Sequence, residues 1–182
     1  MGKISVHEFI TVDGVIEQPT WTFEYPFDPK MGEAIGGLMG TCKAILLGRR
    51  TYEEFAPAWA PRTAEEDPGA PFMNESPKYV VSATLQNAEW NNSTLLGAYD
   101  PDTIRSLKNQ IDGSIYVSGS GTLVRAMLSD GLVDELHLFV FPLVLGSGRR
   151  LFGEGSSPVK LALTAADSYT SGAVHLAYRP AE

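Results

Sequence analysis

The chain has a single cysteine, Cys42, among its 182 residues. One thiol excludes an intrachain disulfide and a cysteine-based metal cluster. The three histidines stand at positions 7, 137 and 175, without the spacing of a helical metal motif, so we expect no bound metal. No apolar run approaches the ~18 residues of a membrane-spanning helix, and no charged-then-apolar signal pattern opens the chain. These absences predict a reduced, cytoplasmic protein with no membrane partner.

Basic residues are also scarce, with 14 lysines and arginines against 22 aspartates and glutamates and a formal net charge of −8. No basic run or stripe is visible, so we expect no nucleic-acid partner. A hydrophobic content of 43% and a length of 182 residues predict one globular domain over residues 1–182 with a sizeable core. In so acidic a chain, the two adjacent arginine pairs at 49–50 and 149–150 are informative.

Hydrophobic periodicity indicates strands that alternate with helices. Strands are expected over residues 3–12, 43–48, 78–84, 93–96, 114–118 and 132–145, and helices from 28, over 51–56, from 100 and over 121–130. A hairpin is expected over 159–178. This order predicts an α/β fold whose sheet is mostly parallel and ends in a C-terminal antiparallel hairpin. Five prolines within residues 57–77 predict a long loop that serves as a lid or an interface segment.

A junction between a short apolar run and an expected helix places two arginines side by side. The apolar run ends at Gly48, and Arg49 and Arg50 follow it. Thr51 with Glu54 three residues later predicts a capping box, and so a helix that starts at Thr51. A helix start offers unpaired N–H groups and partial positive charge, and the arginine fork matches phosphate oxygens. The junction suits a phosphate monoester; the alternative is a plain turn with two solvated arginines.

A second junction is rich in glycine. The turn consists of Gly119, Ser120, Gly121 and Thr122, and Leu123 opens the helical pattern that follows. Glycines let the backbone approach a ligand closely, and a helix start favours an anion. The turn lacks the third glycine of a Rossmann motif and the lysine of a P-loop, so a tight structural turn is the alternative. Taken together, the two junctions suit a dinucleotide with a 2′-phosphate and a pyrophosphate, as in NADPH.

The order of these motifs resembles the dihydrofolate reductase superfamily, including the reductase domain of bacterial riboflavin biosynthesis. The residues that carry the resemblance lie in order at 4–6, 12–16, 47–53, 80–82, 115–123, 133–138 and 145–152. The resemblance implies a dihydrofolate reductase-like three-layer sandwich over the whole chain. It also implies an NADPH site in which residues 48–51 hold the 2′-phosphate, Ser82 meets the adenosine part and residues 119–123 lie under the pyrophosphate. Ile16 then belongs to the loop that covers the active site.

The implied function is a stand-alone, NADPH-dependent reductase of a pterin- or pyrimidine-like heterocycle. It resembles the 5-amino-6-(5-phosphoribosylamino)uracil reductase of riboflavin biosynthesis. Two departures matter: Ser118 stands where those reductases carry a glutamate, and the motifs of the paired deaminase are absent. Two alternatives therefore stay open. One is an enzyme of this fold with another acceptor, such as a nitro or quinone compound, and the other is a non-catalytic module that binds a dinucleotide or flavin.

The resemblance implies a carboxylate that helps to protonate the substrate. Asp28 and Glu33 are the candidates on the helix before the second strand, and we take Asp28 as the catalytic one. A plain N-cap role for Asp28 is the alternative, because aspartate followed by proline is a common helix start. His7 and Glu8 lie on the first strand, and either is a candidate to face the pocket.

Three further residues are candidate substrate contacts. Trp21 and Phe27 belong to an aromatic segment that we expect to stack on a flat heterocycle, with packing over the core as the alternative. Arg149 follows a glycine-rich turn and is expected to meet a substrate phosphate; an exposed turn or a subunit contact is the alternative.

The resemblance to riboflavin-type reductases also implies a homodimer. Phe139 and Phe141 lie in an apolar run around Pro142. Proline removes a ladder donor, so the run is expected to bend or to lie near a sheet edge. An exposed apolar edge is commonly covered, and a two-fold partner would cover it with the same surface on both subunits. A helix of the same chain is the alternative cover.

Overall fold

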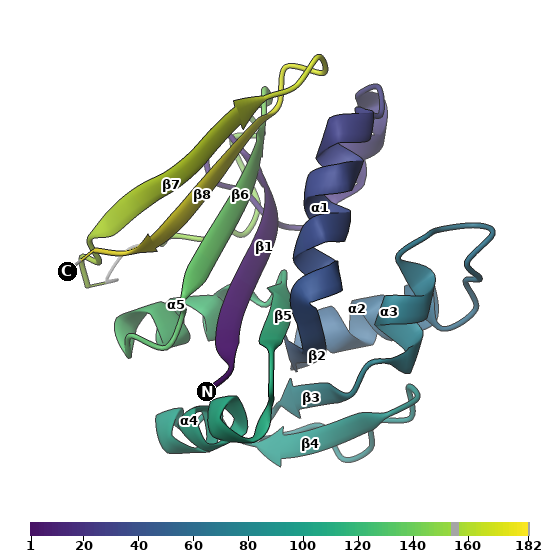
Figure 1. The fold of residues 1–182 in the computed structure, drawn as a ribbon, viewed down its shortest axis with the longest axis vertical. Coiled ribbons are helices and arrows are strands. Elements are labelled where there is room, and N and C mark those ends of the chain that lie inside the picture. The colour runs from purple at the N-terminus through teal and green to yellow at the C-terminus, as the bar shows by residue number, and fades with distance from the viewer. Residues whose placement is uncertain (154–156, 182) are drawn as a thin grey trace.

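A computed structural model of the chain describes residues 1–153 and 157–181. Its centre is an eight-stranded sheet with the order β4-β3-β2-β5-β1-β6-β8-β7 (Figure 1). The strands are β1 (Lys3–Thr11), β2 (Cys42–Gly48), β3 (Lys78–Val81), β4 (Ser93–Gly97), β5 (Ser114–Ser118), β6 (Glu135–Phe141), β7 (Leu161–Ser168) and β8 (Val174–Pro180). The helices are η1 (Pro19–Glu24), α1 (Pro29–Thr41), α2 (Arg49–Trp59), α3 (Ala70–Glu75), α4 (Pro101–Gln110) and α5 (Gly121–Ser129).

The sheet is parallel from β4 across to β6 and antiparallel at its other end. Neighbouring strands from β4 to β6 all pair in parallel, whereas β8 runs antiparallel to both β6 and β7. The predicted α/β fold, with a mostly parallel sheet and a C-terminal antiparallel hairpin, is confirmed. None of the helices formed by the described residues is both long and apolar enough to cross a membrane.

Successive side chains of a strand point to opposite faces of the sheet. Apolar side chains therefore lie on both faces, and helices cover each face. One face, which includes Ile4 and Val6 of β1, packs against α4 and α5 through residues such as Leu107 and Met127. The other face packs against α1, α2 and α3 through two further clusters (Figure 1). The result is three layers: helices, sheet and helices.

Two expectations for the segment around α2 are wrong. The helix begins at Arg49, with Gly48 as its N-cap and no side-chain cap, so Thr51 and Glu54 form no capping box. Thr51 already lies inside the first turn, and its hydroxyl accepts a hydrogen bond from a distant segment instead. The expected loop over 57–77 is also partly helical, because α2 continues to Trp59 and α3 follows.

The apolar run around Pro142 does not form a sheet edge. β6 ends at Phe141 and lies between β1 and β8. Phe139 and Phe141 are buried in a cluster with Trp21 and other residues of the same chain. The alternative cover from the chain itself is therefore the correct one for these two side chains.

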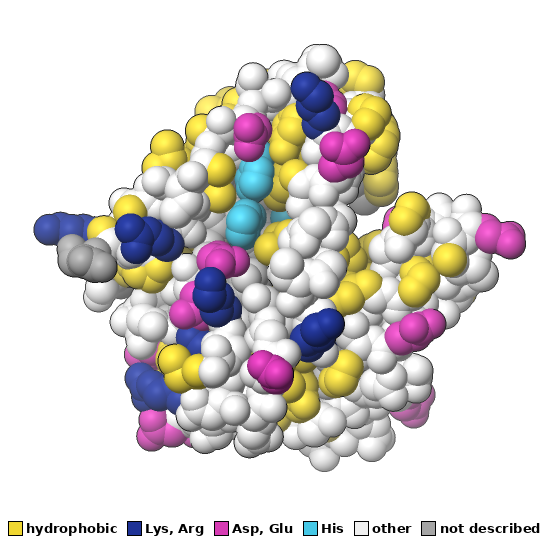
Figure 2. Space-filling model, viewed as in Figure 1, with side chains coloured by type: hydrophobic (Ala, Val, Ile, Leu, Met, Phe, Trp, Pro, Cys, Tyr) yellow, Lys and Arg dark blue, Asp and Glu magenta, His cyan; other side chains and the backbone are white. Residues whose placement is uncertain are grey.

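The histidines of the sheet share the face that packs against α1. His7 of β1 is opposite His137 of β6, and His137 Nδ1 lies 3.0 Å from His175 Nε2 on β8. The ring of His175 stacks on Phe139 with centroids 4.3 Å apart. Histidine side chains are visible at the centre of the surface in Figure 2. Burial lowers the pKa of His7 to about 3 and also lowers the pKa values of His137 and His175.

We predict that these histidines make folding sensitive to acid. Below pH 6.5 an unfolded chain protonates its histidines, whereas the folded chain keeps His7 neutral down to about pH 3 because its pKa is lowered to about 3. The free energy of unfolding should therefore fall as the pH falls from about 6.5 towards 3. Burial raises the pKa of Glu8 and works in the opposite direction, so the histidine contribution is read from a variant. Urea unfolding at several pH values should show a smaller acid loss for His7→Gln than for the wild type, and equal losses would contradict the prediction.

The exposed edge strand β7 is where we propose that a second copy of the chain docks. β7 pairs with β8 on one side only and stands at the end of the sheet. Its Leu163 is 56% exposed. An apolar edge strand of this kind is a template for pairing with another chain. Light scattering should give a mass about twice the 19.7 kDa of one chain, and Leu163→Lys should lower it. A wild-type mass that stays near 19.7 kDa on concentration would contradict the dimer.

Candidate functional site

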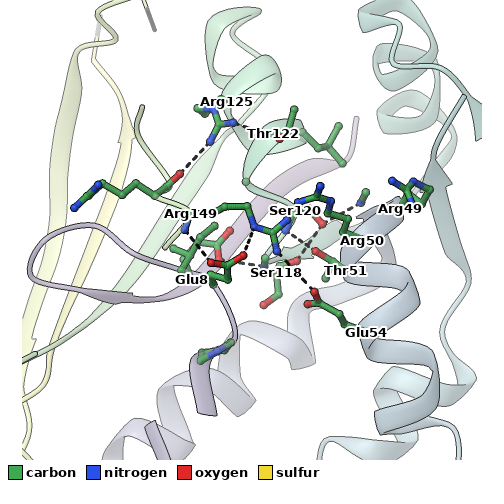
Figure 3. A pocket seen from close by; sticks show the side chains of 18 of the residues that line it. Glu8, Arg49, Arg50, Thr51, Glu54, Ser118, Ser120, Thr122, Arg125 and Arg149 are labelled. Atoms are coloured by element: carbon green, nitrogen blue, oxygen red, sulfur yellow. Dashed lines mark hydrogen bonds and ion pairs between the residues drawn. The ribbon is translucent and has the colours of Figure 1, made fainter. Parts of the chain in front are cut away.

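A cavity of about 1110 Å³ opens at the edge of the sheet where β2, β3 and β5 end and α2 and α5 begin (Figure 3). Open α/β sheets bind ligands at the carboxyl ends of their parallel strands, so its position alone marks it as the candidate site. The predicted residues that line it are Ile16, Gly48, Arg49, Arg50, Thr51, Gly119, Ser120, Gly121, Thr122, Leu123 and Arg149. The structure thus brings the two predicted junctions together, and their binding of a cofactor stays a prediction.

Two hydrogen bonds tie the starts of α2 and α5 to each other. The Ser120 N–H donates to Thr51 Oγ1 (2.8 Å), and the Gly48 N–H donates to Ser120 Oγ (2.9 Å). Gly119 and Ser120 have φ values of 57° and 54°, in the left-handed region that favours glycine. A Cβ on Gly119 would lie only 2.9 Å from Thr51 Oγ1, so the close approach of the two turns requires the missing side chain.

Arginines give the cavity a positive lining in an acidic protein. Arg49 pairs with Glu53 one turn along α2 (3.0 Å), and Arg150 pairs with Asp13 (3.5 Å). The Arg125 guanidinium donates to two backbone carbonyl oxygens. Within the part of the chain that the structure describes, Arg50 makes no ion pair or side-chain hydrogen bond. The exposed guanidinium of Arg50, at the start of a helix, is therefore available to an anionic ligand.

Arg149 is held between two acidic residues. Its Nε lies 2.7 Å from Glu17 Oε1, and its second guanidinium nitrogen lies 3.8 Å from Glu54 Oε1 on α2. These contacts cross the cavity between the loop after β1 and the α2 helix (Figure 3). Two carboxylates offset the charge of Arg149, so a substrate phosphate would have to compete with them. The predicted phosphate contact stays a prediction.

Of the two candidates on β1 to face the pocket, His7 and Glu8, the structure places Glu8 there. It lines the cavity and is 2% exposed. Its Oε2 accepts a hydrogen bond from the Gly119 N–H (3.1 Å). Burial raises the pKa of the Glu8 carboxyl well above its usual range. Strand alternation carried a usable signal, because Glu8 shares its side of β1 with the apolar Val6 and Ile10, which marks a carboxyl on a core-facing position.

Asp28, the candidate proton donor, lies outside the cavity and acts as a helix cap. It is the N-cap of α1, and its Oδ1 accepts a hydrogen bond from the Lys30 N–H (3.0 Å). Its Oδ2 accepts from both the N–H and the hydroxyl of Thr170 (2.8 and 2.7 Å). The bonds from Thr170 lower the pKa of Asp28, which favours the ionised form over an acid that donates a proton. The structure shows the alternative role, the N-cap, and the catalytic role of Asp28 stays a prediction.

Three other predicted contacts also lie off the cavity lining. Trp21 is buried and packs edge-on against Phe141, with centroids 5.4 Å apart. Phe27 is 79% exposed. The Ser82 hydroxyl accepts hydrogen bonds from two N–H groups of the turn that follows β3, whereas its neighbour Val81 does line the cavity. Trp21 therefore packs over the core, which was the alternative to stacking on a ligand.

We predict that a methyl group on Gly119 separates the two turns. Gly119→Ala adds a Cβ that would lie 2.9 Å from Thr51 Oγ1, in addition to the strain of a positive φ. Gly131→Ala is a matched control, because Gly131 also has a positive φ but no atom within 4 Å of such a Cβ. Left-handed strain costs about 1–2 kcal/mol in either variant. Urea unfolding should show a larger loss for Gly119→Ala, and equal losses would show that the turns do not depend on this contact.

Comparison with known proteins finds a family model and two relatives that match most of the chain. The model of the RibD C-terminal domain matches residues 2–175. Two relatives from Bacillus subtilis (strain 168) are the uncharacterized proteins YyaP and YwjB. YyaP is 27% identical over 173 residues, which are 93% of this chain and 90% of YyaP. YwjB is 26% identical over 164 residues, which are 88% of each protein.

Solved structures show the same fold. A putative riboflavin biosynthesis protein from Shewanella sp. PV-4 superposes with a TM-score of 0.82 at 21% identity, over all of both chains. A pyrimidine reductase-like protein from Corynebacterium diphtheriae gives 0.68 at 16% identity, over all of this chain and 92% of that one. A dihydrofolate reductase from Enterococcus faecalis complexed with NADP(H) gives 0.61 at 14% identity, over 100% and 98%. The predicted dihydrofolate reductase-like fold is confirmed.

Proposed function

Because the chain belongs to the RibD C-terminal domain family, we propose that it is an oxidoreductase that uses NADPH to reduce a pterin- or pyrimidine-like heterocycle. One observation carries the proposal. Two helix starts meet in one cavity, and one brings an arginine without a partner in the described chain while the other brings a glycine-rich turn. This pair of features matches the two anionic parts of NADPH.

The 2′-phosphate fits the start of α2. Unpaired N–H groups and partial positive charge favour an anion there, and Arg50 adds a planar fork. The pyrophosphate fits the turn at residues 119–121, which lines the cavity and where glycine lets a ligand approach the backbone closely. The structure of the dihydrofolate reductase from Enterococcus faecalis, complexed with NADP(H), is consistent with such a ligand in this fold.

The rest of the cavity suits a flat acceptor. Phe9 of β1 and Phe55 of α2 line it together with Gln18 and Pro19. Aromatic rings offer an apolar surface for a heterocycle, and the amide of Gln18 offers both a donor and an acceptor. Bound NADPH would supply the hydride, and the work of the protein is to position the acceptor and to exclude water.

The proton that completes such a reduction needs a source in the cavity. Asp28 lies outside it, so the carboxyl groups available there are Glu8, Glu17 and Glu54. Glu17 and Glu54 are both engaged in ion pairs with Arg149. An ordered water is a further source for reductions of this kind.

Oxidation of NADPH with a panel of acceptors tests the proposal. We expect loss of the NADPH absorbance with pterin- or pyrimidine-like acceptors. Turnover only with nitro or quinone compounds would favour the enzyme with another acceptor. Tight binding of NADPH with no turnover on any acceptor would favour the non-catalytic binding module instead.

We predict that Arg50 sets the preference for NADPH over NADH. A charge-assisted hydrogen bond is worth ~1.5–3 kcal/mol, so Arg50→Ala should weaken NADPH binding at least tenfold. NADH lacks the 2′-phosphate and should bind almost unchanged. Arg49→Ala should cost less, because Glu53 already engages that guanidinium. Calorimetric titration with both cofactors measures the difference.

Arg105→Ala is the control for the change in net charge, since Arg105 lies on α4 in an ion pair with Asp102. It should leave both affinities unchanged. Equal losses of NADPH and NADH affinity in Arg50→Ala would overturn the 2′-phosphate assignment.

A further inference from the structure

Glu8 presents one oxygen atom that nothing in the described chain satisfies. Its side chain points from β1 towards the helix start at residues 119–121, and its Oε2 accepts the Gly119 N–H. The other oxygen, Oε1, is shielded from solvent and has no hydrogen-bond partner among the described residues. A buried polar atom left unsatisfied costs free energy, so its retention at the wall of a cavity points to a ligand group that completes it.

The surroundings of Glu8 favour a neutral carboxylic acid. Three arginines of the cavity are engaged by other carboxylates: Arg49 pairs with Glu53, Arg149 with Glu17, and Arg150 with Asp13. No ion pair in the described chain includes Glu8. One backbone N–H does not offset the burial of a charge, and burial accordingly raises the pKa of this carboxyl.

We propose that Glu8 contacts the bound dinucleotide as a neutral acid, with Oε2 accepting from the Gly119 N–H and Oε1 donating a hydrogen bond to a phosphate oxygen of the ligand. The proposal rests on the proposed function, because it takes NADPH or NADP⁺ as the ligand on the glycine-rich turn. Glu8 then has two roles. It holds the turn in place by accepting a hydrogen bond from it, and it donates a hydrogen bond to the anion bound at the turn.

The arrangement makes dinucleotide affinity depend on pH. A proton on Glu8 gives the ligand a donor, whereas an ionised Glu8 places a negative charge beside a negative ligand. The affinity should therefore weaken as the pH rises and Glu8 loses its proton. The loss should appear at a higher pH than the titration of an exposed glutamate, because burial raises the pKa of Glu8.

The charged groups around Glu8 do not supply the same dependence. The arginines of α2, of α5 and of residues 149–150 keep their charge throughout this range. Glu17 and Glu54 are engaged in ion pairs with Arg149. On the neighbouring strands, burial raises the pKa of Tyr116 and lowers the pKa of His7, so both stay neutral.

Calorimetric titration with NADP⁺ between pH 7 and 9.5 tests the proposal, because the 2′-phosphate changes charge only near pH 6. The wild-type affinity should fall about tenfold across this range. Glu8→Gln keeps a neutral group of the same shape, so its affinity at pH 7 should stay within about threefold of the wild type and should not fall at pH 9.5. Glu54→Gln removes another carboxylate of the same cavity, one that pairs with Arg149, and should keep the alkaline loss.

A second variant separates contact with the ligand from support of the turn. Glu8→Leu retains burial but has no donor, so its affinity at pH 7 should fall at least tenfold while thermal unfolding shows an intact fold. Wild-type affinity in Glu8→Leu, an alkaline loss that persists in Glu8→Gln, or a folded Glu8→Gln that does not bind would each overturn the proposal. A wild type that binds no NADP⁺ at any pH would overturn the proposed function itself, and the role of Glu8 with it.

Discussion

The functional site depends on the crossed pair of hydrogen bonds between the starts of α2 and α5. Ser120 donates its N–H to Thr51 and accepts the N–H of Gly48 through its hydroxyl. The two bonds hold together segments that are 69 and 72 residues apart in sequence. They also fix two helix N-termini towards one cavity, where partial positive charge from both favours an anion. That junction brings together the exposed Arg50, the missing side chain at Gly119 and the buried Glu8, and their proposed roles depend on it.

The cavity is a locally positive site in a protein with a negative net charge. Most arginines of the cavity are engaged by carboxylates or carbonyl oxygens, which fixes their positions but offsets their charge. Arg50 differs from them in the described chain, and Glu8 differs from the other cavity glutamates in being buried without a cation. The site therefore combines one available cation with one carboxyl that burial favours as a neutral acid, and both suit a ligand with two phosphate-containing parts.

Local patterns predicted the sheet and the two junctions, because a strand, a glycine and a helix start that follow one another can be recognised from adjacent residues. Longer-range choices could not be read in the same way. Thr51 was expected to cap its own helix, but its hydroxyl serves Ser120 from another part of the chain. Asp28 fitted two roles in sequence, and the structure shows the cap through the Lys30 N–H, with further bonds from Thr170. Alternation along β1 puts Glu8 on the side of Val6 and Ile10, but which layer covers that side depends on the rest of the chain.

The most direct test of this account is a crystal structure of the protein with NADP⁺. The account predicts the 2′-phosphate at the start of α2 beside Arg50 and the pyrophosphate against the backbone of residues 119–121, with Glu8 within hydrogen-bond distance of a phosphate oxygen. A dinucleotide bound in the opposite direction, or with its 2′-phosphate in solvent away from Arg50, would contradict it.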